Sequence, residues 1–168
     1  MTRIVIVGGG YAGFYTAFKL EKLLRRGEAE VVVIDPLPYM TYQPFLPEVA
    51  AGSIEARHAI VPLRRHLPKT RVITGRVTGV DHAKKKVTVT PEGFADFSLD
   101  YDHLVITAGA VSRTFPIPGV ADCAIGMKTI EEAIAIRDRV IDNLHVAADL
   151  PPGKARDRLL TVVVVGGG

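Results

Sequence analysis

A glycine-rich turn between an apolar run and an amphipathic segment is the feature that most constrains the fold of this chain. Residues 3–7 (Arg-Ile-Val-Ile-Val) are rich in β-branched side chains, which predicts a buried parallel strand. The turn Gly8–Gly13 follows directly, and apolar side chains then recur at helical spacing, which predicts a helix over residues 13–26. A second apolar run, residues 30–34, is closed by Asp35 and predicts a second strand. This order predicts one strand–helix–strand unit with a right-handed crossover.

The turn fits the pattern G-x-G-x-x-G, in which each of the three glycines has a structural role that a larger residue could not fill. Gly8 permits a tight turn, Gly10 lets the backbone approach a pyrophosphate, and Gly13 lets the helix lie close to the sheet. Asp35 lies 22 residues after Gly13, the distance expected for a carboxylate that accepts from a ribose hydroxyl. The pattern indicates a dinucleotide site without distinguishing FAD from NAD. A glycine turn that only packs a helix on a sheet is the alternative.

Patterns further along the chain predict the rest of an α/β fold. Residues 37–53 hold three prolines among aromatic side chains, which predicts an ordered loop with a short helical turn near residues 47–51. A capping box of Thr129 and Glu132 predicts the start of a long amphipathic helix. We also expect a helix over residues 58–67, strands over residues 71–75, 103–107 and 159–165, and an antiparallel meander of strands over residues 77–80, 86–90 and 97–101.

Composition excludes several classes of function. The chain has 21 Lys+Arg against 18 Asp+Glu, a formal net charge of +3, and its basic residues are scattered, so we expect no nucleic-acid partner. The single cysteine, Cys123, allows no internal disulfide, and the five histidines show no ligand spacing, so we expect no metal. We interpret Cys123 as a small buried thiol. No apolar run suits a signal peptide or approaches the ~18 residues that span a bilayer.

The strand and glycine pattern at the start of the chain recurs near its end. Residues 161–168 (Thr-Val-Val-Val-Val-Gly-Gly-Gly) repeat the pattern of residues 3–10, with first glycines 158 residues apart. This run lacks the x-x-G and the helix that would supply amide donors to a diphosphate. A strand followed by a tail is one interpretation. We favour the beginning of a second dinucleotide-binding unit, so that the chain is a fragment of a longer protein.

These motifs resemble the N-terminal part of the two-dinucleotide flavoproteins, and within them the type II NADH dehydrogenases (NADH:quinone oxidoreductases). The glycine turn looks like the FAD finger of that family. Residues 39–53 (Tyr-Met-Thr-Tyr-Gln-Pro-Phe-Leu-Pro-Glu-Val-Ala-Ala-Gly-Ser) resemble the family stretch F-Q-P-L-L-Y-Q-V-A-x-G, and residues 104–110 with Pro116–Gly119 resemble V-A-T-G … P-x-I-P-G. The resemblance implies an α/β, Rossmann-like FAD-binding domain, with a parallel sheet, helices and a small antiparallel β-meander insert.

The resemblance also implies a set of cofactor-binding residues. They would contact the pyrophosphate (Gly8, Gly10, Tyr11, Ala12, Gly13), the adenosine ribose (Asp35), the adenine (the backbone of Val77), the flavin side of the cofactor (Ala108, Gly109) and the isoalloxazine (Gln43, Pro44). For Gln43 a purely loop-stabilising hydrogen bond is an equal alternative. No catalytic side chain is implied, because a flavin carries the chemistry itself.

The implied reaction is hydride transfer from NADH to FAD, followed by reduction of a quinone. NADH and quinone would be the partners of the full-length enzyme, with membrane contact through segments outside this chain and a homodimer as its assembly. We expect a cytoplasmic protein, or one peripheral on the cytoplasmic face of the membrane, and no turnover from the fragment itself. The expected domains are FAD-binding (residues 1–119), connecting (120–158) and the start of an NADH-binding domain (159–168). A sulfide:quinone oxidoreductase and a stand-alone NAD(H)-binding module are the alternatives.

Overall fold

The computed structural model describes residues 1–112, 114 and 116–166, and the contacts among them divide the chain into two compact units. The first unit comprises residues Met1–Tyr42 and Ile60–Val111. The second comprises Gln43–Ala59 and the residues from Ser112 onward. Each unit is built from two separate stretches of sequence, so the chain leaves the first unit after Tyr42 and returns to it at Ile60.

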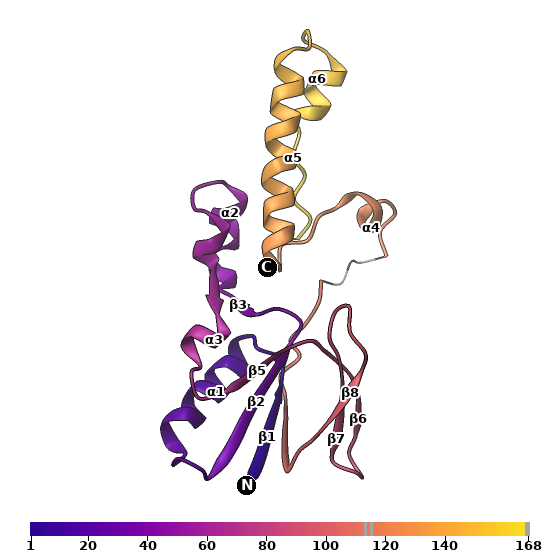
Figure 1. Ribbon diagram of the computed structural model, residues 1–168. Coiled ribbons are helices and arrows are strands. Elements are labelled where there is room, and N and C mark those ends of the chain that lie inside the picture. The colour runs from indigo at the N-terminus through magenta and orange to yellow at the C-terminus, as the bar shows by residue number, and fades with distance from the viewer. Residues whose placement is uncertain (113, 115, 167–168) are drawn as a thin grey trace. The chain divides into compact units, whose positions relative to one another are not determined.

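A four-stranded parallel sheet forms the centre of the first unit, in the order β5-β2-β1-β9, and Figure 1 labels the first three of these strands. Its strands are β1 (Thr2–Val7), β2 (Ala29–Asp35), β5 (Arg71–Thr74) and β9 (His103–Ile106). Because β1 has neighbours on both sides, Val5 pairs with Val32 in β2 and with Leu104 in β9. Val5 is fully buried, as expected of a central parallel strand. The predicted strands are confirmed here.

Helices cover one face of this sheet. The helix α1 (Tyr11–Leu23) buries Phe14 and Ala17 in a cluster with Ile6 and Val33 of the sheet. It begins and ends earlier than the predicted helix over residues 13–26. The helix starts early because Gly10 serves as its N-cap. It stops early because Leu24 is extended and the next turn is held by its own hydrogen bonds, with the backbone N–H of residue 25 donating to the Glu28 carboxylate at 2.9 Å.

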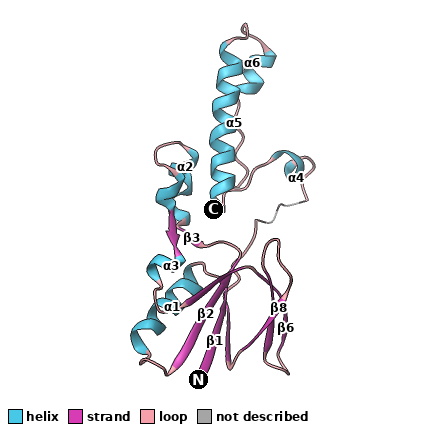
Figure 2. Cartoon of the chain, in the orientation of Figure 1, coloured by secondary structure: helices cyan, strands magenta, loops and turns pink. Residues whose placement is uncertain are grey.

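The predicted antiparallel meander covers the other face of the sheet (Figure 2). It consists of β6 (Arg76–Asp81), β7 (Lys86–Thr90) and β8 (Phe97–Asp100), paired in that order. Val87 and Val89 alternate along β7 with more exposed residues, and both are fully buried against Val5 and Val32. This alternation is what a sheet with one buried face requires. The first unit therefore has three layers, with the parallel sheet in the middle.

The segment between β2 and β5 differs most from expectation. A short antiparallel pair, β3 (Tyr39–Thr41) and β4 (Ile60–Pro62), lies where we predicted only a loop and part of a helix. The predicted helix over residues 58–67 is wrong, because Pro62 has no N–H to donate and its ring blocks a helix interior. The structure instead places the 3-10 helix η2 (Ala56–Ala59) before β4, and the short helix α3 (Leu63–His66) after Pro62.

The second unit is helical among the residues that the structure describes. It contains η1 (Gln43–Phe45), α2 (Leu46–Ala50), η2, α4 (Val120–Cys123), α5 (Ile130–Ala148) and α6 (Lys154–Leu159). The predicted capping box is confirmed at the start of α5: the Glu132 backbone N–H donates to Thr129 Oγ1 at 3.1 Å, and the Thr129 N–H donates to the Glu132 carboxylate at 3.0 Å. The predicted turn of helix near residues 47–51 corresponds to α2, which packs on α5.

Two further predictions about this unit are wrong. No strand forms over residues 159–165, where four valines (Val162–Val165) are 55–83% exposed and find no strand partner within the described chain. A β-branched run favours a strand only where another strand can pair with it. Cys123 is exposed rather than buried, because α4 is a single turn with no buried residue. Gly167 and Gly168 of the second glycine run lie outside the described residues.

No helix in the described part of the chain is long and apolar enough to cross a membrane.

Candidate cofactor-binding site

The glycine turn lies where the strand order of the parallel sheet reverses direction. From β1 the chain passes through α1 to β2 on one side, whereas β9 lies on the other side of β1. The carboxyl ends of these strands are joined by backbone hydrogen bonds, from Gly8 N–H to the Ile34 carbonyl at 2.8 Å and from Thr107 N–H to the Val7 carbonyl at 2.8 Å. In open α/β sheets, ligands bind outside the carboxyl ends of the strands at such a switch point.

Gly8 and Gly13 are required by the protein's own packing. Gly8 has a φ of +101°, and a Cβ there would overlap the Thr107 carbonyl oxygen. A Cβ on Gly13 would overlap the Gly8 carbonyl oxygen and come within 2.8 Å of Thr107 Oγ1. The first turn of α1 therefore rests directly on the glycine turn. This is the close approach of helix and strand for which the sequence pattern selects glycine.

Gly10 is different, because no protein atom requires it. Its φ is −68°, which any residue can adopt, and a Cβ there would meet no atom of the described residues within 4 Å. Gly10 is the N-cap of α1, and the Phe14 N–H closes the first helical turn on its carbonyl oxygen at 2.7 Å. A glycine that the fold does not need, facing open space at the start of a helix, fits a site where a ligand approaches the backbone.

The start of α1 has the electrostatic character of an anion site. The first amides of a helix have no acceptor within the helix, and the helix dipole places partial positive charge there. The first turn of α1 contains no acidic side chain, and no side chain caps it within the described structure. Tyr11 and Ala12 lie in this turn, and the ring of Tyr11 contacts that of Tyr42 with centroids 6.1 Å apart.

Asp35 is fixed beside the glycine turn by two backbone donors. Its Oδ2 accepts from the Gly9 N–H at 2.6 Å, and its Oδ1 accepts from the Leu37 N–H at 2.8 Å. The bond to Gly9 was not predicted, because the sequence does not reveal that the end of β2 reaches across to the turn after β1. A carboxylate oxygen can accept more than one hydrogen bond, so these bonds leave room for a ribose hydroxyl.

The other predicted site residues fall into two groups. Ala108 and Gly109 follow β9 in the first unit; Ala108 lies next to Gly8, and Gly109 has a φ of +72°. A hollow of about 380 Å³ lies where β2 and β5 end and β6 begins, next to Val77, and is lined by Pro36, Thr74, Gly75, Arg76, Thr90, Pro91 and Glu92. Gln43 and Pro44 lie in η1 of the second unit, so their predicted place beside the isoalloxazine stays a prediction.

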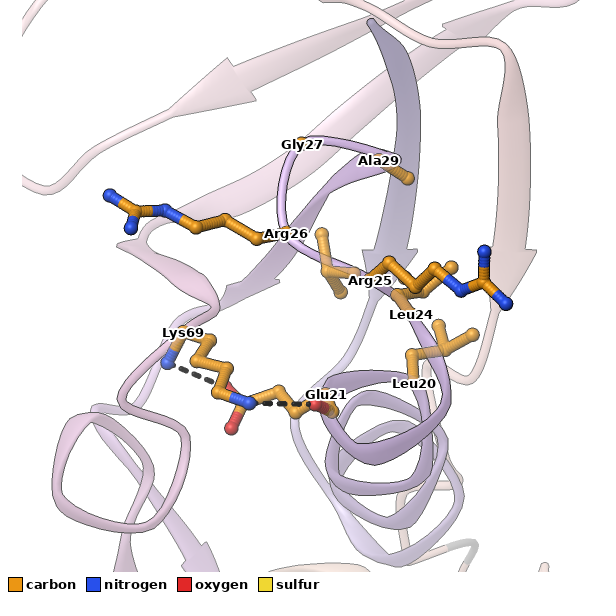
Figure 3. Close-up of a pocket in the computed structure, with 9 residues that line it drawn as sticks. Leu20, Glu21, Leu24, Arg25, Arg26, Gly27, Ala29 and Lys69 are labelled. Carbon is orange, nitrogen blue, oxygen red and sulfur yellow. Dashed lines mark hydrogen bonds between the residues drawn. The ribbon is translucent and has the colours of Figure 1, made fainter.

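A larger hollow, of about 460 Å³, lies at the opposite end of the sheet (Figure 3). It is formed by the end of α1 and the start of β2, and Lys69 crosses it, donating from Nζ to the Glu21 carbonyl at 3.1 Å. The guanidinium groups of Arg25 and Arg26 point away from each other, so they form no common anion site (Figure 3). Because the glycine turn is at the other end of the strands, we do not assign the cofactor to this hollow.

Comparisons with known proteins agree with this geometry. The family description "Pyridine nucleotide-disulphide oxidoreductase" matches residues 2–168. The chain is 39% identical to an external alternative NAD(P)H-ubiquinone oxidoreductase of Arabidopsis thaliana mitochondria, over 99% of this chain and 30% of the relative. It is 33% identical to a type II NADH:quinone oxidoreductase of Mycobacterium tuberculosis, over 99% of this chain and 35% of that protein. The structure of NDH2 from Plasmodium falciparum superposes with a TM-score of 0.81 and 26% identity, over 91% of this chain and 31% of the other.

Proposed function

Because the chain belongs to the pyridine nucleotide-disulphide oxidoreductase family, we propose that it is the FAD-binding part of an enzyme that passes electrons from NADH through FAD to a quinone. The similarity to NADH:quinone oxidoreductases of two organisms supports this activity. The chain spans about a third of the length of those relatives, so the proposal for the whole reaction goes beyond the part described. The single observation that carries the cofactor assignment is the open face of Gly10 at the strand switch point.

FAD, when bound, supplies the chemistry by accepting a hydride and passing on two electrons. The task of this chain's residues is to bind and orient the dinucleotide. The pyrophosphate would lie against Gly8 and Gly10 and accept hydrogen bonds from the first-turn amides of α1, at Tyr11, Ala12 and Gly13. The helix dipole favours an anion at this position by about 0.3–1 kcal/mol.

Asp35 would accept from the adenosine ribose while it keeps its bond to Gly9. The hollow where β6 begins would receive the adenine, because its lining includes Pro36, which follows Asp35, and Arg76, which precedes Val77. Ala108 and Gly109 would pass the flavin half of the molecule, and Gln43 and Pro44 would lie beside the isoalloxazine. These placements follow from the family resemblance, together with the positions of the first-unit residues around the glycine turn.

The proposed function also implies a domain organisation, a cellular location and an oligomeric state. We propose that residues 1–119 form the FAD-binding domain, 120–158 connect it, and 159–168 begin an NADH-binding domain. The repeat of the first glycine pattern at residues 161–168 supports the last assignment. We propose a cytoplasmic enzyme that works as a homodimer. Because a quinone is a lipid-soluble acceptor, the enzyme would meet it at the cytoplasmic face of the membrane.

Titration calorimetry of the chain with FAD and with NADH tests the cofactor assignment. We expect the wild-type chain to bind FAD and Gly10→Ala to raise the Kd for FAD at least about tenfold. The reason is that the new methyl group occupies the space through which the pyrophosphate would reach the backbone. Gly79→Ala is the matched control: Gly79 also has an ordinary φ, and a Cβ there would make only ordinary contacts, the nearest at 3.5 Å to Thr88 Oγ1. Its FAD affinity stays that of the wild type. A chain that binds no FAD, or a Gly10→Ala variant that binds normally, contradicts the proposal.

One of the alternatives gives a different result in the same experiment. A stand-alone NAD(H)-binding module would prefer NADH to FAD. A sulfide:quinone oxidoreductase would also bind FAD, and its cysteine chemistry would involve Cys123 of this chain only if that thiol, which lies exposed on the single-turn helix α4, reached the flavin. The structure therefore gives no specific support to that second activity.

A further inference from the structure

We propose that Thr107 is a positioning residue for the dinucleotide: its hydroxyl group holds the glycine turn in the shape that receives FAD, without contacting FAD itself. This inference rests on the proposed function. Thr107 follows the last residue of β9, and its partly buried side chain points to the turn that follows β1. The sequence did not predict it as a site residue.

Side chains on both sides of β1 hydrogen-bond to the glycine turn, and Thr107 is one of them. Its Oγ1 lies 2.9 Å from the Val7 carbonyl oxygen and 3.0 Å from the Gly8 carbonyl oxygen. A hydroxyl group has one proton, so this proton is shared between the two acceptors. On the other side of β1, Asp35 accepts from the Gly9 N–H. The Thr107 and Asp35 side chains thus hold the peptide group between Gly8 and Gly9 at both ends, at its carbonyl oxygen and at its N–H.

The atoms around the Thr107 hydroxyl leave no room for a larger group. A Cβ on Gly13 would come within 2.8 Å of Thr107 Oγ1, so the first turn of α1, the glycine turn and the hydroxyl already touch. A methyl group in place of the hydroxyl would lie about 3 Å from two carbonyl oxygens, whereas carbon and oxygen stay about 3.3 Å or more apart. Thr107→Val therefore both removes the hydrogen bonds and pushes the turn away from its position.

A second threonine provides a control at the opposite end of the same sheet. Thr70 is 9% exposed, and its hydroxyl donates to Glu21 Oε1 at 2.7 Å; Glu21 lines the hollow of Figure 3. Thr70→Val removes a hydroxyl hydrogen bond of the first unit, as Thr107→Val does, but does so far from the glycine turn. The comparison separates a general loss of stability from a specific loss of the turn's shape.

The experiment compares Thr107→Val, Thr107→Ser and Thr70→Val in the full chain. It measures the FAD Kd by quenching of flavin fluorescence, the melting temperature, and hydrogen exchange of the peptide that spans Gly8–Gly13. Thr107→Val raises the Kd about tenfold and speeds exchange in that peptide. Thr107→Ser, which keeps the hydroxyl, stays within about threefold of the wild type. Thr70→Val lowers the melting temperature but changes neither the Kd nor the exchange of the turn.

Either of two results overturns the inference. One is a Thr107→Val variant with the wild-type Kd and wild-type exchange of the turn. The other is a Thr107→Ser variant as weak as Thr107→Val, because the hydroxyl would then not be the cause. A wild-type chain that binds no FAD would contradict the proposed function instead, and the exchange of residues 8–13 would still decide the role of Thr107.

Discussion

Replacing Gly13 by alanine should destabilise the protein far more than replacing Gly10, although both glycines belong to the same motif. A Cβ on Gly13 would overlap the Gly8 carbonyl oxygen and come within 2.9 Å of the Gly8 carbonyl carbon. These are backbone atoms that cannot swing aside, so the helix itself must move. Overpacking of this kind costs about 1–3 kcal/mol, and backbone contacts belong at the upper end.

The net effect is smaller, because alanine favours a helix over glycine by about 0.8–1.0 kcal/mol. We therefore expect Gly13→Ala to lower the free energy of unfolding by about 2 kcal/mol. For a chain of 168 residues, that corresponds to a fall in melting temperature of about 4–8 °C. An added Cβ at Gly10 meets no atom within 4 Å in the part of the chain that the structure describes. The loss of a favourable N-cap residue is offset by the stiffer unfolded chain, so the free energy of unfolding changes by no more than about 1 kcal/mol.

Urea unfolding followed by circular dichroism, together with thermal melts, measures both variants against the wild type. The variants should share the wild-type slope with urea, because the surface exposed on unfolding is unchanged. A Gly13→Ala variant as stable as the wild type would refute the packing argument. So would a Gly10→Ala variant that loses as much stability as Gly13→Ala, because a Cβ has space at Gly10 and has none at Gly13.

Three further changes probe other parts of the chain. Asp35→Asn weakens the charged hydrogen bond to Gly9, so the free energy of unfolding falls by about 1–2 kcal/mol in urea titrations and FAD binds more weakly. Thr129→Ala removes the N-cap of α5 and costs about 1 kcal/mol in the same assay. The pKa of Asp81 is lowered from its ordinary value of 3.8, first by the backbone N–H of Lys84, then by that residue's side chain. Its stabilising contribution is therefore complete above pH 3.8 and is lost as the pH falls through the lowered pKa, so the melting temperatures of the wild type and Asp81→Asn converge in acid.

Local signals in the sequence were sufficient for much of the fold. Local signals mark the limits of each element in the strand–turn–helix–strand unit: the apolar runs, three glycines at fixed spacing and an acidic residue at the end of β2. The helix α5 was predictable because the capping box and the apolar spacing agree with each other. Agreement between independent local signals is what makes such predictions dependable.

Predictions failed where the outcome depended on a distant partner. Residues 159–165 have high strand propensity, but no other strand pairs with them among the described residues. The three-residue strand β3 exists because β4 pairs with it, which no local pattern reveals. In the candidate site, the motif identified the glycines and Asp35, whereas Thr107 needed the structure, because its acceptors lie about 100 residues earlier in the chain.

The excursion of the chain between Tyr42 and Ile60 has a consequence for synthesis on the ribosome. Leu46 and Val49 of α2 are buried within the second unit, where α2 packs on α5. The helix α5 begins 80 residues after α2 ends, so at roughly 5–20 residues per second it emerges about 4–16 s later. During that interval the nascent chain carries an uncovered apolar segment, which is a natural substrate for a chaperone.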